Sequence, residues 1–462
     1  MQINYLSLSQ FRGIQDASIN FKPGFNLIVG VNGAGKSSVL DALCIVLARA
    51  LPALTPSGAH SGVATRVADI TVNKSALAIV AKFTCHATDF ALTLTEQASG
   101  VQSAIDQDRG LKDIRDVDEL PTLRRHERPE PGDPRLAGTL RGQTSINPEA
   151  QELTPTPDPK LKKAANQPLV LFLSVRRSIP SERATSSKKG SAYQAVFNVE
   201  RGLEIRTLAQ WWKARESLAA EDPSSKSATQ LAAARAALKE MLPSMADWRV
   251  EGEQVLVDKI VEVSGIAASG EPEVREERRT LPISSLSDGE KSLIAITTDI
   301  AQRLAVLNPN EANPVKTGNG VVLLDEIDLH LHPSWQRHIA IHLPKVFPGL
   351  QFIATTHSPQ VIGETEPGRA ILLHAGGKVE YLDESLGRDS GWILRHVMDT
   401  PERNAELQAG LDEVDQLIDS EEFDAAKEKV HSLRSRFGND KELIGAAAAI
   451  ARWEPTDDEE DS

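Results

Sequence analysis

The sequence has few of the residues that define several large classes of protein. Only two cysteines, Cys44 and Cys85, occur among its 462 residues. This is too few for a disulfide framework or a thiolate metal site, so both are expected to be small buried side chains.

Aromatic residues make up 4% of the chain, which leaves little material for stacking on nucleic-acid bases. No apolar run approaches the roughly 18–20 residues that cross a bilayer, and residues 1–20 show no signal-peptide pattern. We therefore expect a cytoplasmic protein without membrane contact.

The sequence also lacks an excess of positive charge, since its formal net charge is −14. A chain that coats nucleic acid by bulk charge is usually basic, so any DNA contact here would need a local basic patch. Candidate patches lie at 160–163, at 176–177 with Arg183 and 188–189, and at Arg275 with 278–279. Scattered solvated charge explains these clusters equally well, and DNA binding stays an open possibility.

The most informative stretch that is present runs from Gly30 to Ser37 and matches the phosphate-binding pattern G-x-x-x-x-G-K-[ST]. An apolar run, 25–29, precedes it as a predicted buried strand, and residues from Ser37 onward have apolar side chains at helical spacing. Backbone amides of such a loop surround a triphosphate, Lys36 reaches the terminal phosphates, and the Ser37 hydroxyl is a ligand for Mg2+. The predicted nucleotide contacts are Asn32, Gly33, Ala34, Gly35, Lys36, Ser37 and Ser38.

Three later segments contain further residues that could act on a nucleotide bound by this loop. Residues 321–326 form an apolar strand that ends in Asp325 and Glu326, where a phosphate-loop ATPase holds Mg2+ and polarises the attacking water. Residues 286–292 open a helix at Ser287 and offer a hydroxyl and amides, although an ordinary helix cap has the same pattern. Residues 352–359 are a strand that ends in Thr-His-Ser-Pro.

Together these segments resemble the ABC-type ATPases, whose signature is L-S-x-G-[EQ]. The resemblance implies that Ser287, Gly289 and Glu290 contact ATP held by a second subunit, so that two heads sandwich the nucleotide in a homodimer or higher homo-oligomer. It implies that His357 is the switch histidine, which contacts the γ-phosphate and orders the hydrolytic water. Asp328 would lie in the loop that crosses the dimer interface.

The resemblance narrows to the RecF/SMC/OLD branch, which begins with a Phe-Arg-Gly/Asn-Ile strand like residues 11–14. In that branch Arg12 would lie near the nucleotide. Within it the chain is most similar to the short-armed AAA_21/AAA_23-like ATPases, which include PtuA of the Septu and related retron defence systems. This similarity implies an ATPase that regulates a separate DNA-directed partner, such as an HNH-type nuclease in anti-phage defence.

Three alternatives remain beside this interpretation. One is a RecF-like repair ATPase that binds DNA itself, and another is a transporter nucleotide-binding subunit, which the RecF-like opening disfavours. A metal site at His330 and His332 with nearby aspartates is the third. The chain has no H-N-H pattern and no Ser/Cys/His catalytic set, and residues 389–462 are too few and too helical for the Toprim nuclease of OLD proteins. If DNA is cut, we expect another chain to cut it.

The predicted fold is α/β: an ABC-type P-loop NTPase head, with a mixed sheet flanked by helices, a helical insertion and a helical C-terminal extension. The head has no glutamine after the strand near Val170, where the family has its Q-loop, so hydrolysis is expected to be slow. The predicted segments are 1–97, the first half of the head; 98–167, a polar proline-rich insertion; 168–200, a continuation of the head; 201–247, a short helical insertion; 248–385, the second half of the head; and 386–462, the helical extension with an acidic tail.

Overall fold

The computed structural model describes residues 1–57, 63–97, 100–104, 162, 164–175, 192–193, 196–197, 205–251, 254–266 and 272–453. The chain divides into two compact units, Met1–Leu386 and Gly387–Ser462. Most of the proline-rich insertion predicted at 98–167 lies outside the described residues, as do Arg176 and Arg177.

A six-stranded sheet forms the centre of the first unit, in the order β14-β13-β3-β12-β11-β7. Its strands are β3 (Phe25–Val29), β7 (Leu169–Leu173), β11 (Gly320–Leu324), β12 (Leu350–Thr355), β13 (Ala370–Leu373) and β14 (Val379–Leu382). The first five run parallel and β14 is antiparallel. Every residue of these five parallel strands is buried, which explains why they appear in the sequence as short continuous apolar runs.

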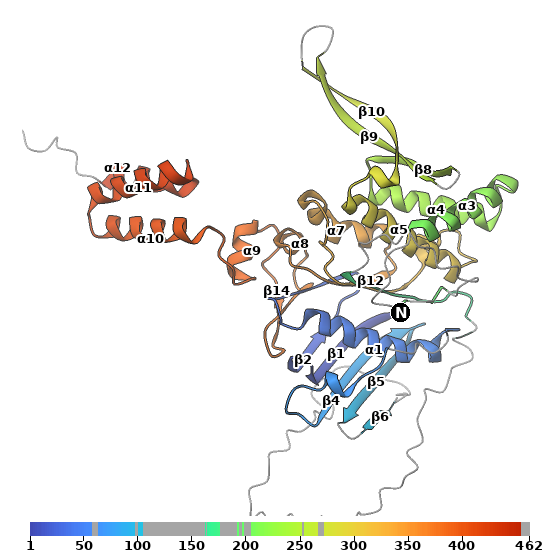
Figure 1. Ribbon diagram of the computed structural model, residues 1–462. Helices are drawn as coiled ribbons and strands as arrows, with labels where there is room; N and C mark the ends of the chain where they lie inside the picture. The colour runs from blue at the N-terminus through green and yellow to red at the C-terminus, as the bar shows by residue number, and fades with distance from the viewer. Residues whose placement is uncertain are drawn as a thin grey trace, which may run out of the picture. The chain divides into compact units, whose positions relative to one another are not determined.

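A second, antiparallel sheet has the order β2-β1-β4-β5-β6. It consists of β1 (Gln2–Phe11), β2 (Ile14–Asn20), β4 (Ala76–Cys85), β5 (Thr88–Gln97) and β6 (Gly100–Ala104). Helix α1 (Lys36–Leu54) lies between this sheet and β12 (Figure 1). It is long and apolar enough to span a membrane by length and composition, contrary to the expectation that no such segment exists, but 72% of its apolar window is buried inside the protein. Its apolarity reflects a position between two sheets.

The insertion between β7 and the second half of the head contains two helices and a third sheet. These elements are α3 (Ile205–Glu221), α4 (Lys226–Met241), β8 (Met245–Glu251), β9 (Gln254–Ile266) and β10 (Pro272–Pro282), with sheet order β10-β9-β8. Both helices lie within the helical insertion predicted at 201–247. Beyond the end of β8, β9 and β10 continue as a two-stranded hairpin that extends away from the rest of the unit (Figure 1). The sequence analysis identified only the basic cluster at 275–279 in this hairpin.

The second half of the head supplies the helices that flank the central sheet. They are α5 (Asp288–Leu307), α6 (Pro314–Thr317), α7 (Pro333–Val346) and α8 (Pro359–Gly363). Two short 3-10 turns, Val67–Asp69 and Ile283–Ser285, precede β4 and α5.

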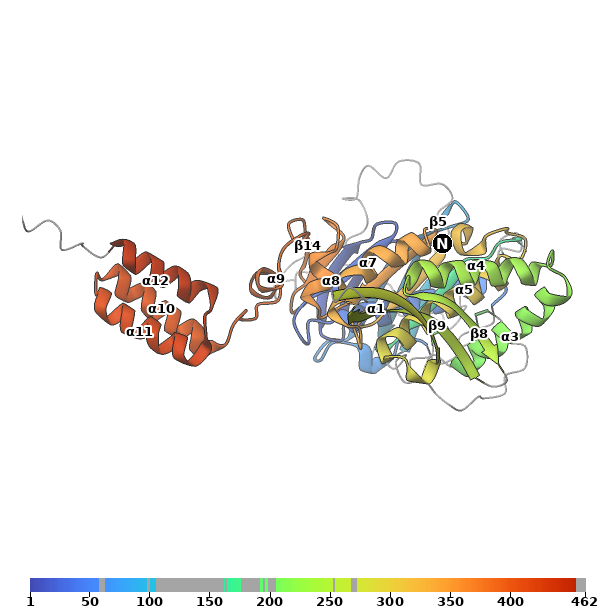
Figure 2. The same ribbon diagram turned by 90° about the horizontal axis from the view of Figure 1, so that it is seen from above.

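The second unit is helical, as the sequence predicted. Its helices are α9 (Ser390–His396), α10 (Ala405–Asp419), α11 (Phe423–Phe437) and α12 (Lys441–Trp453), which Figure 2 shows from above. The apolar positions that recur along α10 and α11 form its core together with residues of α12. Gly410 lies where a Cβ atom would come within 2.6 Å of Leu433, so the absence of a side chain lets these helices approach closely.

Candidate functional site

The candidate site lies where the parallel strands β3, β11 and β12 end. Their carboxyl ends meet at one edge of the sheet, which is where open α/β sheets bind ligands. A cavity of about 330 Å³ lies there. It is lined by Asn32, Gly33, Gly35, Lys36, Ser37, Ser38, Asp325, Glu326, Thr355 and His357.

The conformation of the phosphate-binding loop depends on two glycines. Gly30 has φ +154°, and a Cβ atom there would lie 2.3 Å from the carbonyl oxygen of Leu373 in β13. Gly35 caps α1 in the left-handed region at φ +102°, which favours glycine. These constraints turn the chain from β3 into α1 so that the helix N-terminus faces the cavity, an arrangement that favours an anion.

The ammonium group of Lys36 lies inside this loop. Its Nζ donates to the carbonyl oxygens of Gly30 at 2.8 Å and Val31 at 3.2 Å, and the residue is 6% exposed. Burial lowers the pKa of Lys36, and Asp325 and Glu326 oppose that shift. A polyphosphate in the cavity would add negative charge beside this ammonium and favour its charged form.

Asp325 and Ser37 provide hard oxygen donors side by side. The hydroxyl of Ser37 lies 3.2 Å from each carboxylate oxygen of Asp325. A hydroxyl and a carboxylate are ligands that Mg2+ prefers, particularly together with substrate phosphates. These two residues therefore fit a Mg2+ ion that would neutralise phosphate charge.

Thr355, at the end of β12, fixes both acidic residues of β11. Its hydroxyl donates to Asp325 Oδ1 at 2.6 Å and accepts the backbone N–H of Glu326 at 2.8 Å. Glu326 has φ +48°, a conformation that non-glycine residues seldom adopt. The sequence assigned no role to Thr355, because a threonine in an apolar strand carries no signal of what its hydroxyl contacts.

His357 and Asp328 come from two loops that contact each other. The hydroxyl of Thr356 donates to Asp328 Oδ1 at 2.5 Å, and the backbone N–H of His357 donates to the same oxygen at 3.3 Å. Asp328 is outside the cavity lining but orients the segment that places His357 in it. The loop after β11 and the loop after β12 thus form one unit beside the phosphate-binding loop.

The predicted signature lies elsewhere. Ser287 caps α5 in a reciprocal capping box with Glu290, and Glu290 also accepts from Lys259 of β9 at 2.6 Å. Burial raises the pKa of Glu290, but hydrogen bonds from Lys259 and Ser287 outweigh it and the pKa is lowered overall. Ser287, Gly289 and Glu290 do not line the cavity of their own chain.

Gly289 lets the signature segment, 286–292, pack closely on the loop after β11. A Cβ atom there would lie 2.7 Å from the carbonyl oxygen of His330. The signature helix therefore packs directly on the loop that contains Asp328 and His330. Within the described residues, no group of three or more His, Cys, Asp or Glu side chains could hold a metal ion, so the alternative of a metal site around His330 and His332 gains no support.

Arg12 is the predicted site residue whose contacts differ most from expectation. Its guanidinium group forms ion pairs with Asp41 of α1 and, at 2.9 Å, with Asp69, and it is absent from the cavity lining. These ion pairs connect Arg12, just after β1, to α1 and to the turn at Asp69. A contact between Arg12 and the nucleotide stays a prediction. Ala34 lies buried within the loop and is likewise absent from the lining.

Comparison with known proteins finds relatives of this chain among AAA-type ATPases. The family model "AAA domain, putative AbiEii toxin, Type IV TA system" matches residues 157–363, and the model "AAA domain" matches residues 5–195. The probable ATPase of retron Ec83 from Escherichia coli is 41% identical over 169 residues, which is 36% of this chain and 31% of that protein. The chain is thus similar to P-loop AAA-type ATPases, among them ATPases named for retron and Septu systems.

Two further proteins are similar to this chain. Septu protein PtuA from Bacillus mycoides (strain KBAB4) is 38% identical over 117 residues, 25% of this chain and 16% of that protein. The SMC head domain from Thermotoga maritima is 16% identical with a TM-score of 0.42, covering 83% of this chain and 100% of that one. The chain spans less than a third of the length of the retron Ec83 ATPase and of PtuA.

Proposed function

We propose that the chain binds and hydrolyses ATP with Mg2+ as a head-to-head dimer, and that this cycle regulates a separate DNA-directed effector, an HNH-type nuclease in anti-phage defence. The observation that supports this most is the composition of the cavity. One chain provides the phosphate-binding loop, the two carboxylates and His357, while its signature residues lie outside. A second copy that brings Ser287 and Gly289 over the cavity would complete the site.

Each residue has a distinct part in this proposal. Lys36 and the loop amides bind the phosphates, and Ser37 and Asp325 hold Mg2+, which neutralises charge on the transferred phosphoryl group. Glu326 accepts a proton from the attacking water, and His357 positions that water and the γ-phosphate. The defence role and the effector rest on the retron and Septu relatives, which match only part of this chain.

Two variants test the ATP cycle separately. Lys36→Ala should weaken ATP binding about 10- to 100-fold, because a charge-assisted contact to phosphate is lost. Glu326→Gln should keep ATP affinity but lower turnover about 10²- to 10⁴-fold, since the general base is removed. Calorimetry measures the first effect and phosphate release measures the second.

The dimer is tested with the same proteins by light scattering. Glu326→Gln should accumulate as an ATP-bound dimer that the unmodified chain forms only transiently, while Lys36→Ala should stay monomeric with ATP. Glu428→Gln, at an exposed glutamate of α11, is the control and should behave like the unmodified chain. Unchanged affinity and turnover in both site variants would refute the proposal.

A further inference from the structure

Helix α7 follows the loop after β11, and Gln336 lies in its first turn. Pro333 opens the helix, and the backbone N–H of Gln336 donates to the carbonyl oxygen of His332 at 3.1 Å. Side chains of a helix lean toward its N-terminus. The side chain of Gln336 therefore extends back over the loop after β11, and it does not line the nucleotide cavity.

Gln336 binds the loop after β11 through its amide nitrogen. Its Nε2 donates to the carbonyl oxygen of Leu331 at 2.9 Å and to that of Asp328 at a longer 3.4 Å. The backbone N–H of Leu331 donates to the Asp328 carbonyl at 3.0 Å, so that residues 328–331 form a hydrogen-bonded turn. The amide nitrogen of Gln336 thus holds this turn against the start of α7.

The amide oxygen of Gln336 binds the loop after β12. The hydroxyl of Ser358 donates to Gln336 Oε1 at 2.7 Å. Ser358 directly follows His357 and also caps α8, because its hydroxyl accepts the N–H of Val361 at 3.4 Å. One amide group therefore connects the two loops, since it donates to the first and accepts from the second.

His357 lies between two neighbours that are both held in this way. Thr356, before it, donates to the carboxylate of Asp328, and Ser358, after it, donates to Gln336. Both hydrogen bonds lead to the segment that contains Asp328. His357 lines the nucleotide cavity, whereas the four residues that hold its segment do not. The place of His357 in the cavity thus depends on contacts made outside it.

We propose that Gln336 is a positioning residue for ATP hydrolysis, which holds the loops after β11 and β12 together and thereby keeps His357 in place. This inference rests on the proposed function, because it gives Gln336 a part in that reaction. None of its three bridging hydrogen bonds involves Lys36, Ser37 or Asp325, so ATP and Mg2+ should bind without the bridge. The hydrolytic step should suffer, because a displacement of about 1 Å at a reacting group can lower a rate about 100-fold.

Two substitutions of Gln336 test the bridge. Gln336→Met keeps the length of the side chain but removes both ends of the bridge. It should lower kcat about 10- to 100-fold and leave KM for ATP within about twofold. Phosphate release over a range of ATP concentrations measures both constants. An unchanged kcat, or a rise in KM as large as the fall in kcat, would overturn the inference.

Gln336→Glu separates the two ends of the bridge. Its carboxylate still accepts from Ser358 but has no N–H group for the carbonyl oxygens of Leu331 and Asp328, which it would repel. We expect kcat to fall over the same range as in Gln336→Met. If Gln336→Glu kept the unmodified kcat, contact with the loop after β11 would be unnecessary, and the proposed bridge would be wrong.

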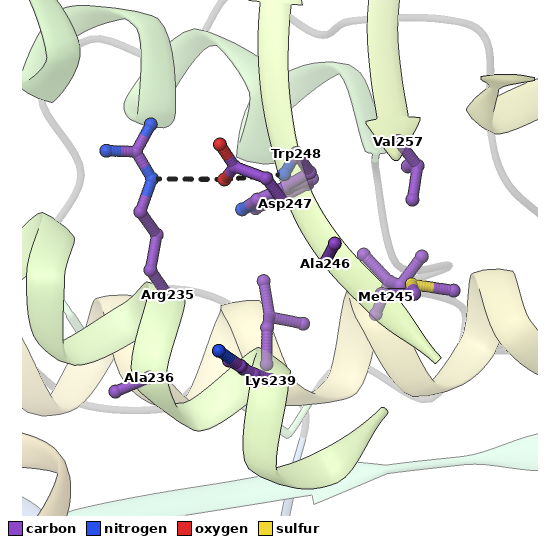
Figure 3. A pocket seen from close by; sticks show the side chains of 10 residues that line it. Arg235, Ala236, Lys239, Met245, Ala246, Asp247, Trp248 and Val257 are labelled. Atoms are coloured by element: carbon purple, nitrogen blue, oxygen red, sulfur yellow. Dashed lines mark hydrogen bonds and ion pairs between the residues drawn. The ribbon is translucent and has the colours of Figure 1, made fainter. Parts of the chain in front are cut away.

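Helix α4 provides the matched control. Figure 3 shows Arg235, Ala236 and Lys239 of this helix beside β8, around a cavity of about 180 Å³ that shares no residue with the nucleotide cavity. Gln230 of the same helix donates through Nε2 to the carbonyl oxygen of Ala305 in α5 at 3.1 Å. Gln230→Met removes this hydrogen bond between two elements of the same unit and should keep both kcat and KM. An equal fall of kcat in Gln230→Met and Gln336→Met would contradict a specific role of Gln336.

The position of His357 can also be tested without turnover. In the nucleotide-free chain with ¹⁵N-labelled histidine, the ring signals of the 11 histidines are recorded by NMR, and that of His357 is assigned by His357→Ala. This signal should shift or broaden in Gln336→Met and stay unchanged in Gln230→Met. An unmoved signal in Gln336→Met would overturn the inference, whereas a lack of phosphate release by the unmodified chain would refute the proposed function. The two failures are therefore distinguishable.

Discussion

Thr355 has a larger part in the site than its place in an apolar strand suggests. Its single hydroxyl holds the carboxylate of Asp325 and the backbone of Glu326 at once. Without that hydroxyl, the donor to Asp325 and the acceptor for the Glu326 amide are both lost. Both acidic residues would then be free to leave the positions that the proposed chemistry needs.

Thr355→Val should therefore lower ATP turnover about 10- to 100-fold, as is usual when the hydrogen-bond partner of a metal ligand is removed. Steady-state phosphate release at saturating ATP and Mg2+ measures this. Thr365→Val removes a comparable buried hydroxyl, bonded to the Val361 carbonyl away from the cavity, and serves as the control. A turnover drop of equal size in both variants would show a general loss of folding and not a role at the site.

Glu290 also makes several contacts at once, and these make the stability of the fold depend on pH. Its pKa in the folded chain is lowered, despite burial, by Lys259 and Ser287. A lowered pKa means that the ionised carboxylate stabilises the fold above its ordinary pKa, and this contribution is lost as the pH falls through the folded pKa. The stabilisation is thus present at neutral pH and lost in acid.

Glu290→Gln should be less stable than the unmodified chain at pH 7, and the difference between the two should shrink as the pH is lowered from about 5 to 3. Thermal unfolding measured across this range checks the sign. Asp288→Asn, which changes an exposed first-turn acid of the same helix, is the comparison. A difference that grows toward low pH would contradict the role given to the Lys259 contact.

At the scale of elements, the sequence predicted the parts that are buried on all sides. Strands β3, β11 and β12 are short apolar runs followed by motif residues, and both features are visible without knowing the fold. The parallel pairing that brings Gly30, Asp325 and His357 to one edge follows from strands that alternate with helices. Nine of the cavity-lining residues were accordingly predicted from the sequence.

The β9–β10 hairpin shows where such prediction fails. Among the described residues, its outer part extends away from the other elements (Figure 1). Accordingly, β10 lacks the alternation of apolar residues and has Glu and Arg instead. Thr280 of β10 lies opposite Asp258 of β9, and Arg278 reaches Asp258 diagonally at 2.6 Å. Arg279 pairs with Glu277 of its own strand at 2.7 Å. These arginines of a candidate DNA patch are thus paired with carboxylates, which weakens the case for a DNA surface there.

At the scale of the whole molecule, the separation of the cavity from the signature decides how copies would cooperate. Lys36 belongs to one face of the proposed sandwich and Ser287 to the other. ATP bound by one chain would be closed by its partner, so ATP binding and dimer formation should be thermodynamically linked. The Q-loop position after β7 has Ser174 in place of glutamine, and slow turnover stays a prediction for it.

The separation of the nucleotide cavity from the signature residues of the same chain has a genetic consequence. In a mixed dimer of a Lys36→Ala chain with a Ser287→Arg chain, both defects fall in the same composite site, and the other site keeps an intact loop and an intact signature. Mixed in equal amounts with ATP, the two chains should together recover part of the unmodified turnover through the intact composite site, although neither chain is active alone. Two defective alleles would then complement each other, whereas two alleles that are defective in the same motif would not.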